Sequence, residues 1–267
     1  MQPYSDVPRK SHCEQTKKCK VSSHKLKTAV PACLHLLECH SLHTLFHLAN
    51  MQEARLNMIK NQLRAGGIHS QDVIDAVSAV RREEFVPESC RQYAFADMEI
   101  PLPYGQNMLT PLSEALVLQE AGIGRNDTVL EIGTGSGYMA ALLAHQARHV
   151  TSVEIEEGLK EQARNNLARY GIKNVRLVHD NGFLIDRYAA DRLFDVIVFS
   201  GSVSNIPETF KDRLADNGRM IVFYGQEPCT QAIFLQKNSS VDFKSGILFE
   251  TSVKPLKEQP GRLPFRF

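Results

Sequence analysis

The 267-residue chain lacks several features that mark common classes of protein. No uninterrupted apolar run reaches the roughly 20 residues of a membrane-spanning helix. The N-terminus also lacks the basic region, apolar core and small-residue cleavage site that follow one another in a secretory signal. The formal net charge is only +1, which argues against dedicated nucleic-acid binding. Four of the six cysteines fall in the first 50 residues, which leaves only Cys90 and Cys229 beyond them. These absences predict a reduced, cytoplasmic protein with neither a membrane nor a nucleic acid as its partner.

The first 50 residues differ in composition from the rest of the chain. They carry seven Lys or Arg against three Asp or Glu, so residues 51–267 carry 24 against 27 and are mildly acidic. Residues 1–30 are polar and show no periodicity, which is typical of disorder. We therefore predict that residues 1–50 are a disordered or extraneous extension. Residues 51–267 are predicted to form one domain, with a helical, substrate-side segment over 51–125 and a cofactor-binding core over 126–267.

Four side chains near the end of the extension raise a zinc hypothesis. Cys39 and His40 are followed by His43 and His47 at helical spacing, and zinc takes thiolate and imidazole ligands. However, the Cys-x2-Cys spacing of a structural zinc site is missing. We therefore expect no metal site here.

The stretch Val129–Tyr138 is the clearest local signal in the chain. A short apolar run that ends at Ile132 is followed by Gly133, Gly135 and Gly137, and then by a helical apolar pattern. A strand, a glycine turn and a helix in this order form the nucleotide-binding corner of a doubly wound α/β sheet. Glycine suits the turn because the backbone there takes positive φ and approaches a ligand closely.

Downstream of this stretch, strand and helix patterns alternate. We predict an α/β fold with a doubly wound, mostly parallel seven-stranded sheet of Rossmann-like type, an N-terminal helical elaboration and a C-terminal antiparallel hairpin. The strand candidates cover 128–132, 149–153, 174–178, 194–200, 219–224, 232–236 and 246–252.

The spacing of the glycines bears on which ligand the turn binds. The dinucleotide fingerprint is G-x-G-x-x-G, whereas this chain has G-x-G-x-G preceded by Glu131, and so resembles the first motif of class I S-adenosylmethionine-dependent methyltransferases. About 20 residues past the glycines, Glu154 closes the next strand candidate, where an acidic side chain accepts hydrogen bonds from ribose hydroxyls. The pair of signals favours S-adenosylmethionine over NAD and disfavours a dehydrogenase.

Segments ahead of the glycine turn make the resemblance narrower. From about Met51 to the C-terminus the chain resembles the protein-L-isoaspartate O-methyltransferase family. The segments that carry this resemblance are Gln62–Arg64, Phe85–Glu88, Tyr93–Asp97 and Gly105-Gln106, with Pro111 five residues on. The resemblance implies methylation of the α-carboxylate of isoaspartyl residues in damaged proteins, with S-adenosylmethionine as cofactor. We expect such an enzyme to be a monomer.

The chain departs from the family pattern on the substrate side. The family has a Ser after the Gly-Gln pair that helps to hold the substrate carboxylate, and equal spacing puts Leu109 at that position. Either the hydroxyl of Thr110 replaces it or the acceptor differs. Two alternatives therefore remain open: a methyltransferase with another acceptor, and a cofactor-binding protein that does not catalyse.

A second departure is Asp180-Asn181-Gly182, where the family usually has Gly-Asp-Gly with the Asp near the adenine. Either Asp180 or Asn181 is a candidate for that contact. The predicted substrate-side residues are Thr110 and Asp97. The predicted cofactor-binding residues are Glu131, Gly133, Thr134, Gly135, Gly137, Tyr138, Glu154, Asp180 and Asn181.

Overall fold

A computed structural model describes residues 50–239 and 242–257 of the chain. The predicted disorder of the N-terminal extension and the zinc candidates Cys39, His40, His43 and His47 lie outside the described residues. None of the helices in the described part is long and apolar enough to span a bilayer.

Helical elements precede the sheet, as the sequence predicted. Residues 50–58 are α-helical and continue into a π-helical turn, η1 (Ile59–Leu63). Helix α2 (Gln71–Ala79) begins after Ser70, whose side chain accepts a hydrogen bond from the amide of Val73. This cap satisfies one of the backbone donors that a helix start leaves unpaired. Further elements before the sheet are η2 (Arg82–Glu84), η3 (Glu88–Tyr93), β1 (Ile100–Pro101), η4 (Pro103–Gly105), β2 (Asn107–Met108) and α3 (Pro111–Ala121).

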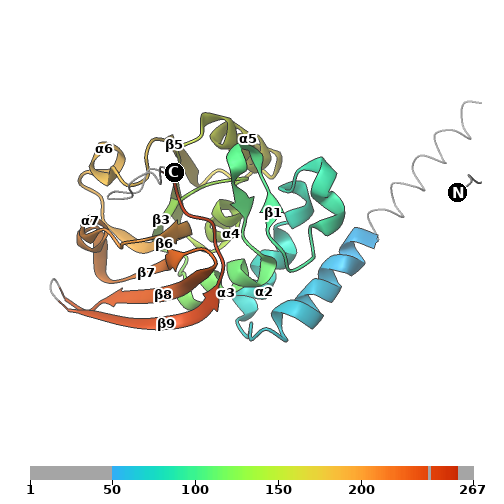
Figure 1. The fold of residues 1–267 in the computed structure, drawn as a ribbon, viewed down its shortest axis with the longest axis horizontal. Helices are drawn as coiled ribbons and strands as arrows, with labels where there is room; N and C mark the ends of the chain where they lie inside the picture. The colour runs from blue at the N-terminus through green and yellow to red at the C-terminus, as the bar shows by residue number, and fades with distance from the viewer. Residues whose placement is uncertain (1–49, 240–241, 258–267) are drawn as a thin grey trace, which may run out of the picture. The chain divides into compact units, whose positions relative to one another are not determined.

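The sheet has seven strands in the order β5-β4-β3-β6-β7-β8-β9. The strands are parallel from β5 to β7, whereas β8 pairs antiparallel with both β7 and β9. The seven strands and the C-terminal hairpin predicted from the sequence are thus confirmed. Figure 1 shows β6, β7, β8 and β9 in this order from the centre of the sheet to one of its edges. The strands and helices from Thr128 onward are β3 (Thr128–Ile132), α4 (Tyr138–Gln146), β4 (His149–Glu154), α5 (Glu157–Arg169), β5 (Val175–His179), α6 (Ile185–Ala189), β6 (Phe194–Val203), α7 (Glu208–Asp212), β7 (Leu214–Gln226), β8 (Cys229–Lys237) and β9 (Phe243–Thr251).

The central strands are buried on both faces, which explains their continuous apolar runs. In β6, Val196 and Val198 belong to a core that also holds residues of α2, α3, α4 and α5. The alternate residues Ile197 and Phe199 belong to a second core with α6 and α7. The period of two along the strand therefore divides its side chains between two helical layers, as expected of a doubly wound sheet.

The strand order places the ligand-binding edge. From β3 the chain moves outward through β4 to β5 and then returns to β6, which pairs with β3 on its other side. In open α/β sheets, ligands bind at the carboxyl ends of the strands where the order reverses. That point lies after Ile132 of β3 and at the end of β6.

Candidate functional site

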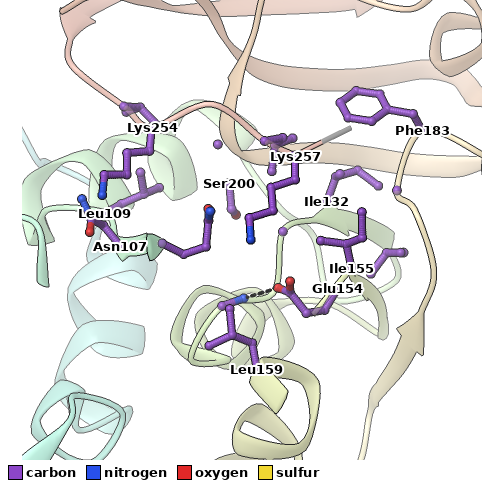
Figure 2. A pocket seen from close by; sticks show the side chains of 18 of the residues that line it. Asn107, Leu109, Ile132, Glu154, Ile155, Leu159, Phe183, Ser200, Lys254 and Lys257 are labelled. Carbon is purple, nitrogen blue, oxygen red and sulfur yellow. Dashed lines mark hydrogen bonds between the residues drawn. The ribbon is translucent and has the colours of Figure 1, made fainter. Parts of the chain in front are cut away.

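A cavity lies at this reversal point. It holds about 670 Å³ of space between its walls, part of it open to solvent. Its walls come from the ends of β3, β4 and β6, from the loop after β5, from the segment 99–109 and from the C-terminal segment. Figure 2 shows the side chains of these elements converging on it.

The glycine turn forms one wall of the cavity. Gly133 and Gly135 line it, with φ of +94° and +54°. A Cβ added at Gly133 would fall 2.9 Å from Cδ2 of Leu256, so both the backbone conformation and the space require glycine there. Gly137, with φ +85°, precedes α4 and faces Ala163 of α5, where an added Cβ would lie 3.0 Å from the Ala163 Cβ. The third glycine thus packs two helices together and does not line the cavity.

Glu154, at the end of β4, lines the same wall. Its carboxylate accepts hydrogen bonds from the amides of Gly135 at 2.8 Å and Glu156 at 3.0 Å, and Figure 2 shows the first of these. Burial raises the pKa of Glu154 above its ordinary value, and the two amides oppose that shift. Each carboxylate oxygen has a second lone pair, so Glu154 can still accept from a ligand hydroxyl while it fixes the turn.

Glu131 supports the turn from below. Its side chain is fully buried and accepts from the hydroxyls of Ser152 at 2.6 Å and Ser200 at 2.9 Å. The Ser152 hydroxyl also lies 2.6 Å from that of Thr134. Burial raises the pKa of Glu131 to about 8, against the effect of the two serines. Glu131 and Thr134 therefore tie the turn to strands β4 and β6.

A small recess adjoins the cavity behind the glycine turn. Gly133, Thr134, Gly135 and Tyr138 line it, together with the buried Glu114 of α3. The Arg82 guanidinium forms an ion pair with Glu114 and lies 5.0 Å from the centroid of the Tyr138 ring. Burial raises the pKa of Glu114 to about 8, while Arg82 opposes the shift. The recess thus places a buried acidic side chain, Glu114, beside the glycine turn.

Asp180 and Asn181 shape the turn after β5. Asp180 forms a salt bridge with Arg187 at 3.1 Å, and the side-chain oxygen of Asn181 accepts from the amide of Phe183 at 2.9 Å. The residues from this loop that line the cavity are Gly182 and Phe183. Which of Asp180 and Asn181 contacts the adenine stays a prediction; both side chains help to hold the loop that carries Gly182 and Phe183.

The side chains of the two predicted substrate-side residues, Thr110 and Asp97, both accept hydrogen bonds from the first turn of α3. The Thr110 hydroxyl accepts from the amide of Ser113 at 3.2 Å, and an Asp97 carboxylate oxygen accepts from the amide of Leu112 at 3.1 Å. Neither is among the residues that line the cavity. Their predicted roles in substrate binding stay predictions, and in this structure their polar atoms cap the helix. Leu109, in contrast, lines both the cavity and the recess.

Several residues that line the cavity were missed in the sequence analysis. Ser200 and Gly201 follow from the rule that ligands meet the carboxyl ends of strands, because the strand candidate ended there. Lys254, Leu256 and Lys257 come from the C-terminal segment, which carries no motif. Arg82, which the sequence analysis also did not single out, is not in the cavity lining: its side chain is 1% exposed, and its guanidinium donates to the carbonyl of Leu109 at 2.7 Å.

A doubly wound sheet with a glycine turn after its first strand, an acid at the end of the second and a cavity between them defines a nucleoside-binding α/β protein of the class I methyltransferase type. The particular family follows from comparison with known proteins. Residues 53–256 match the family model of protein-L-isoaspartate(D-aspartate) O-methyltransferase, and the chain belongs to that family.

Relatives and solved structures agree with this assignment. The chain is 36% identical over 183 residues to a protein-L-isoaspartate O-methyltransferase of Methanoculleus marisnigri. The aligned residues cover 68% of this chain and 82% of that protein. It is 34% identical over 212 residues to one of Koribacter versatilis, with 79% and 94% covered.

Among solved structures, a protein-L-isoaspartate O-methyltransferase superposes with a TM-score of 0.66 at 25% identity, over 79% of this chain and 67% of the other. A putative protein-L-isoaspartate O-methyltransferase from Plasmodium falciparum, in complex with S-adenosyl-L-homocysteine, superposes with a TM-score of 0.68 at 22% identity, over 76% of this chain and 98% of the other. At that identity the second likeness shows the fold alone.

Proposed function

We propose that the chain is an S-adenosylmethionine-dependent methyltransferase that transfers a methyl group to the α-carboxylate of isoaspartyl residues in damaged proteins. The observation that carries the proposal is family membership over residues 53–256, together with a cavity at the glycine turn that opens beside the segment 99–109. We further propose that the enzyme acts as a monomer in the cytoplasm.

The residues of the cavity fit S-adenosylmethionine. Gly133 and Gly135 line the cavity without side chains, so a nucleoside can approach their backbone closely. Glu154 offers carboxylate lone pairs to the ribose hydroxyls, and Ile155 and Phe183 supply apolar surface on the same side. When bound, S-adenosylmethionine supplies a methyl group on a positively charged sulfur, which makes that methyl an activated electrophile.

Methylation of a carboxylate requires no general base. A carboxylate is ionised at neutral pH, so an oxygen lone pair can form the new bond to the methyl carbon while the carbon–sulfur bond breaks. No proton has to move. What the chain supplies is orientation and exclusion of water. Leu109, Ile132 and Leu256 line the cavity with apolar surface and serve the second purpose.

A paired peptide assay tests the proposal. The protein should transfer labelled methyl from S-adenosylmethionine to a peptide with one isoaspartyl residue, and transfer none to the same peptide with an ordinary aspartyl residue. Equal labelling of both peptides, or labelling of neither, would contradict the proposal.

A second candidate function keeps the cofactor and changes the acceptor. It is favoured by Leu109, whose side chain is 5% exposed and carries no hydrogen-bond donor at the cavity wall. This candidate predicts turnover on another carboxylic acid or on a hydroxyl compound with no labelling of the isoaspartyl peptide. Binding of S-adenosylhomocysteine without transfer to any acceptor would instead indicate a non-catalytic binding protein.

A further inference from the structure

The C-terminal strap, which we define as Val253–Lys257, crosses the end of β6. The amide of Ser202 donates to the carbonyl of Lys254 at 2.9 Å, and the amide of Leu256 donates to the carbonyl of Ser202 at 3.0 Å. The Val253 side chain is 3% exposed. The backbone of the strap is therefore fixed on the sheet, and the side chains of Lys254 and Lys257 start from defined positions at the cavity.

The two lysines of the strap have different partners. The Lys257 ammonium forms an ion pair with Glu156, next to the cofactor side of the cavity. The Lys254 ammonium donates to the carbonyl of Gly105 at 3.0 Å, and among the described residues no carboxylate forms an ion pair with it. Figure 2 shows Lys254 reaching toward the side of Asn107 and Leu109, whereas Lys257 reaches toward that of Glu154.

The segment 99–109, which forms the acceptor side of the cavity, offers no charged donor to an anion; its neutral side-chain donors in the cavity lining are the amides of Gln106 and Asn107. Leu109 has no donor in its side chain. The Ser200 hydroxyl donates to Glu131 at 2.9 Å, and the Asn107 amide donates to Glu99 at 2.7 Å. An ammonium group has three donors, of which Lys254 uses one on a neutral carbonyl. A buried carboxylate needs such donors, because leaving it unpaired is costly.

We propose that Lys254 binds the carboxylate of the methyl acceptor and selects for a negatively charged acceptor. The inference rests on the proposed function, since it takes the acceptor to be a carboxylate. One oxygen would accept from the ammonium, and the other would keep a lone pair for the methyl carbon. A charge-assisted hydrogen bond of this kind is among the strongest that a side chain offers.

The nearby acidic groups limit the reach of this charge. Glu99 lines the cavity, and Glu227 lines an outer hollow that Lys254 also borders. Lys257 borders the same hollow but is paired with Glu156, so the carboxylates of Glu99 and Glu227 leave the mouth without a net positive charge. Lys254 therefore selects its ligand by direct contact and not by long-range attraction, which falls off within a Debye length of about 8–10 Å at physiological salt.

A binding experiment tests Lys254 apart from turnover. The full chain, saturated with S-adenosylhomocysteine, is titrated with an isoaspartyl peptide and with the same peptide in which the α-carboxylate is an amide. We expect the wild-type protein to bind the carboxylate peptide about tenfold more tightly or better. Lys254→Met should reduce this preference to less than about twofold, and Lys254→Arg should restore most of it.

A matched control comes from the other lysine of the strap. Lys257→Met removes the same charge from the same segment, and it should keep the tenfold preference because Lys257 already has Glu156 as its partner. The affinity of each variant for S-adenosylhomocysteine reports whether the cavity is intact. An unchanged value in Lys254→Met, with the peptide preference lost, supports the proposal.

Other outcomes overturn the proposal. If Lys254→Met keeps the preference, another group binds the carboxylate. If both Lys254 variants lose S-adenosylhomocysteine binding, Lys254 is a structural brace for Gly105. If the wild-type protein methylates no isoaspartyl peptide, the proposed function itself fails. If it does methylate the peptide and Lys254→Met keeps the preference, only the role of Lys254 fails.

Discussion

The two sides of the cavity are built in different ways. The cofactor side consists of backbone at the ends of parallel strands, held by the buried carboxylates of Glu131 and Glu154. The acceptor side consists of the segment 99–109, which precedes the sheet, and the strap, which follows it. Its cavity lining combines the buried, apolar Leu109 with the charged Glu99 and Lys254. The cofactor side therefore depends on backbone shape, and the acceptor side depends on which side chains these two segments bring together.

This difference indicates where specificity can change. A backbone turn with positive φ tolerates few substitutions, so the cofactor side has little freedom. On the acceptor side, Leu109 and Lys254 both lie outside the strands of the seven-stranded sheet. Other side chains can therefore replace them without disturbing those strands. One fold can thus keep its cofactor while its acceptor group is recognised by different side chains.

The largest expected effect is on the cofactor side. Gly135→Val places a β-branched residue at φ +54°, with its Cβ 3.2 Å from the Cδ1 atom of Leu102. Both the strain and the loss of space oppose binding. We expect affinity for S-adenosylhomocysteine to fall about 100-fold or more, as measured by isothermal titration calorimetry.

Gly246→Val is the control for this substitution. Gly246 lies on β9, and a Cβ added there meets no atom within 4 Å, so we expect unchanged affinity. If Gly135→Val also bound normally, the cofactor would not lie against the glycine turn, and the contrast between the two sides would have no basis.

A smaller effect is expected from Leu109→Ser on the acceptor side. The new hydroxyl can donate to the acceptor carboxylate, but Lys254 already does so in our proposal. We expect kcat/KM for the isoaspartyl peptide to rise only about threefold in the wild-type background and about tenfold in the Lys254→Met background. Steady-state kinetics with the four proteins of this cycle measures the coupling.

The same substitution has a cost in stability. Leu109 is buried, and removing most of its side chain should lower the free energy of unfolding by about 2–4 kcal/mol. Urea unfolding curves give this value separately from activity. Equal gains in kcat/KM in both backgrounds would show that positions 109 and 254 act independently. That result would contradict the idea that a hydroxyl at position 109 and the Lys254 ammonium donate to the same carboxylate.

The sequence predicted the fold and the residues that the structure groups at the glycine turn, because both depend on local patterns. The apolar run, the three glycines and Glu154 are read from about 25 consecutive residues. The structure brings Gly133, Gly135 and Glu154 together at one wall of the cavity. Apolar runs likewise located the central strands β3, β4 and β6, since a strand buried on both faces has few polar residues.

The acceptor side could not be predicted in this way, because it is assembled by tertiary contacts. Arg82 stands in a run of four charged residues, yet its guanidinium is buried against Glu114 and the carbonyl of Leu109. Lys254 reaches the carbonyl of Gly105 across 149 positions of sequence. No pattern in either segment indicates such a partner.

A further expected effect concerns the pH dependence of stability on the cofactor side. Burial raises the pKa of Glu131 to about 8, from an ordinary value of 4.5. Between these values the folded protein binds a proton at Glu131 that the unfolded chain releases. The stability from this group is therefore fully present below pH 4.5 and is lost as the pH rises through 8.

Glu131→Gln removes that titration and keeps nearly the same shape. We expect the unfolding free energy of the variant to fall less steeply between pH 5.5 and 7.5, by about 1.4 kcal/mol per pH unit. Urea unfolding at three pH values in this window measures the slope. Glu157→Gln changes a carboxylate whose side chain is 69% exposed and should leave the slope unaltered. Equal slopes in wild-type protein and Glu131→Gln would mean that Glu131 stays ionised beneath the glycine turn. The cofactor side would then be held by a buried charge, and not by the neutral hydrogen-bonded carboxyl group that the raised pKa implies.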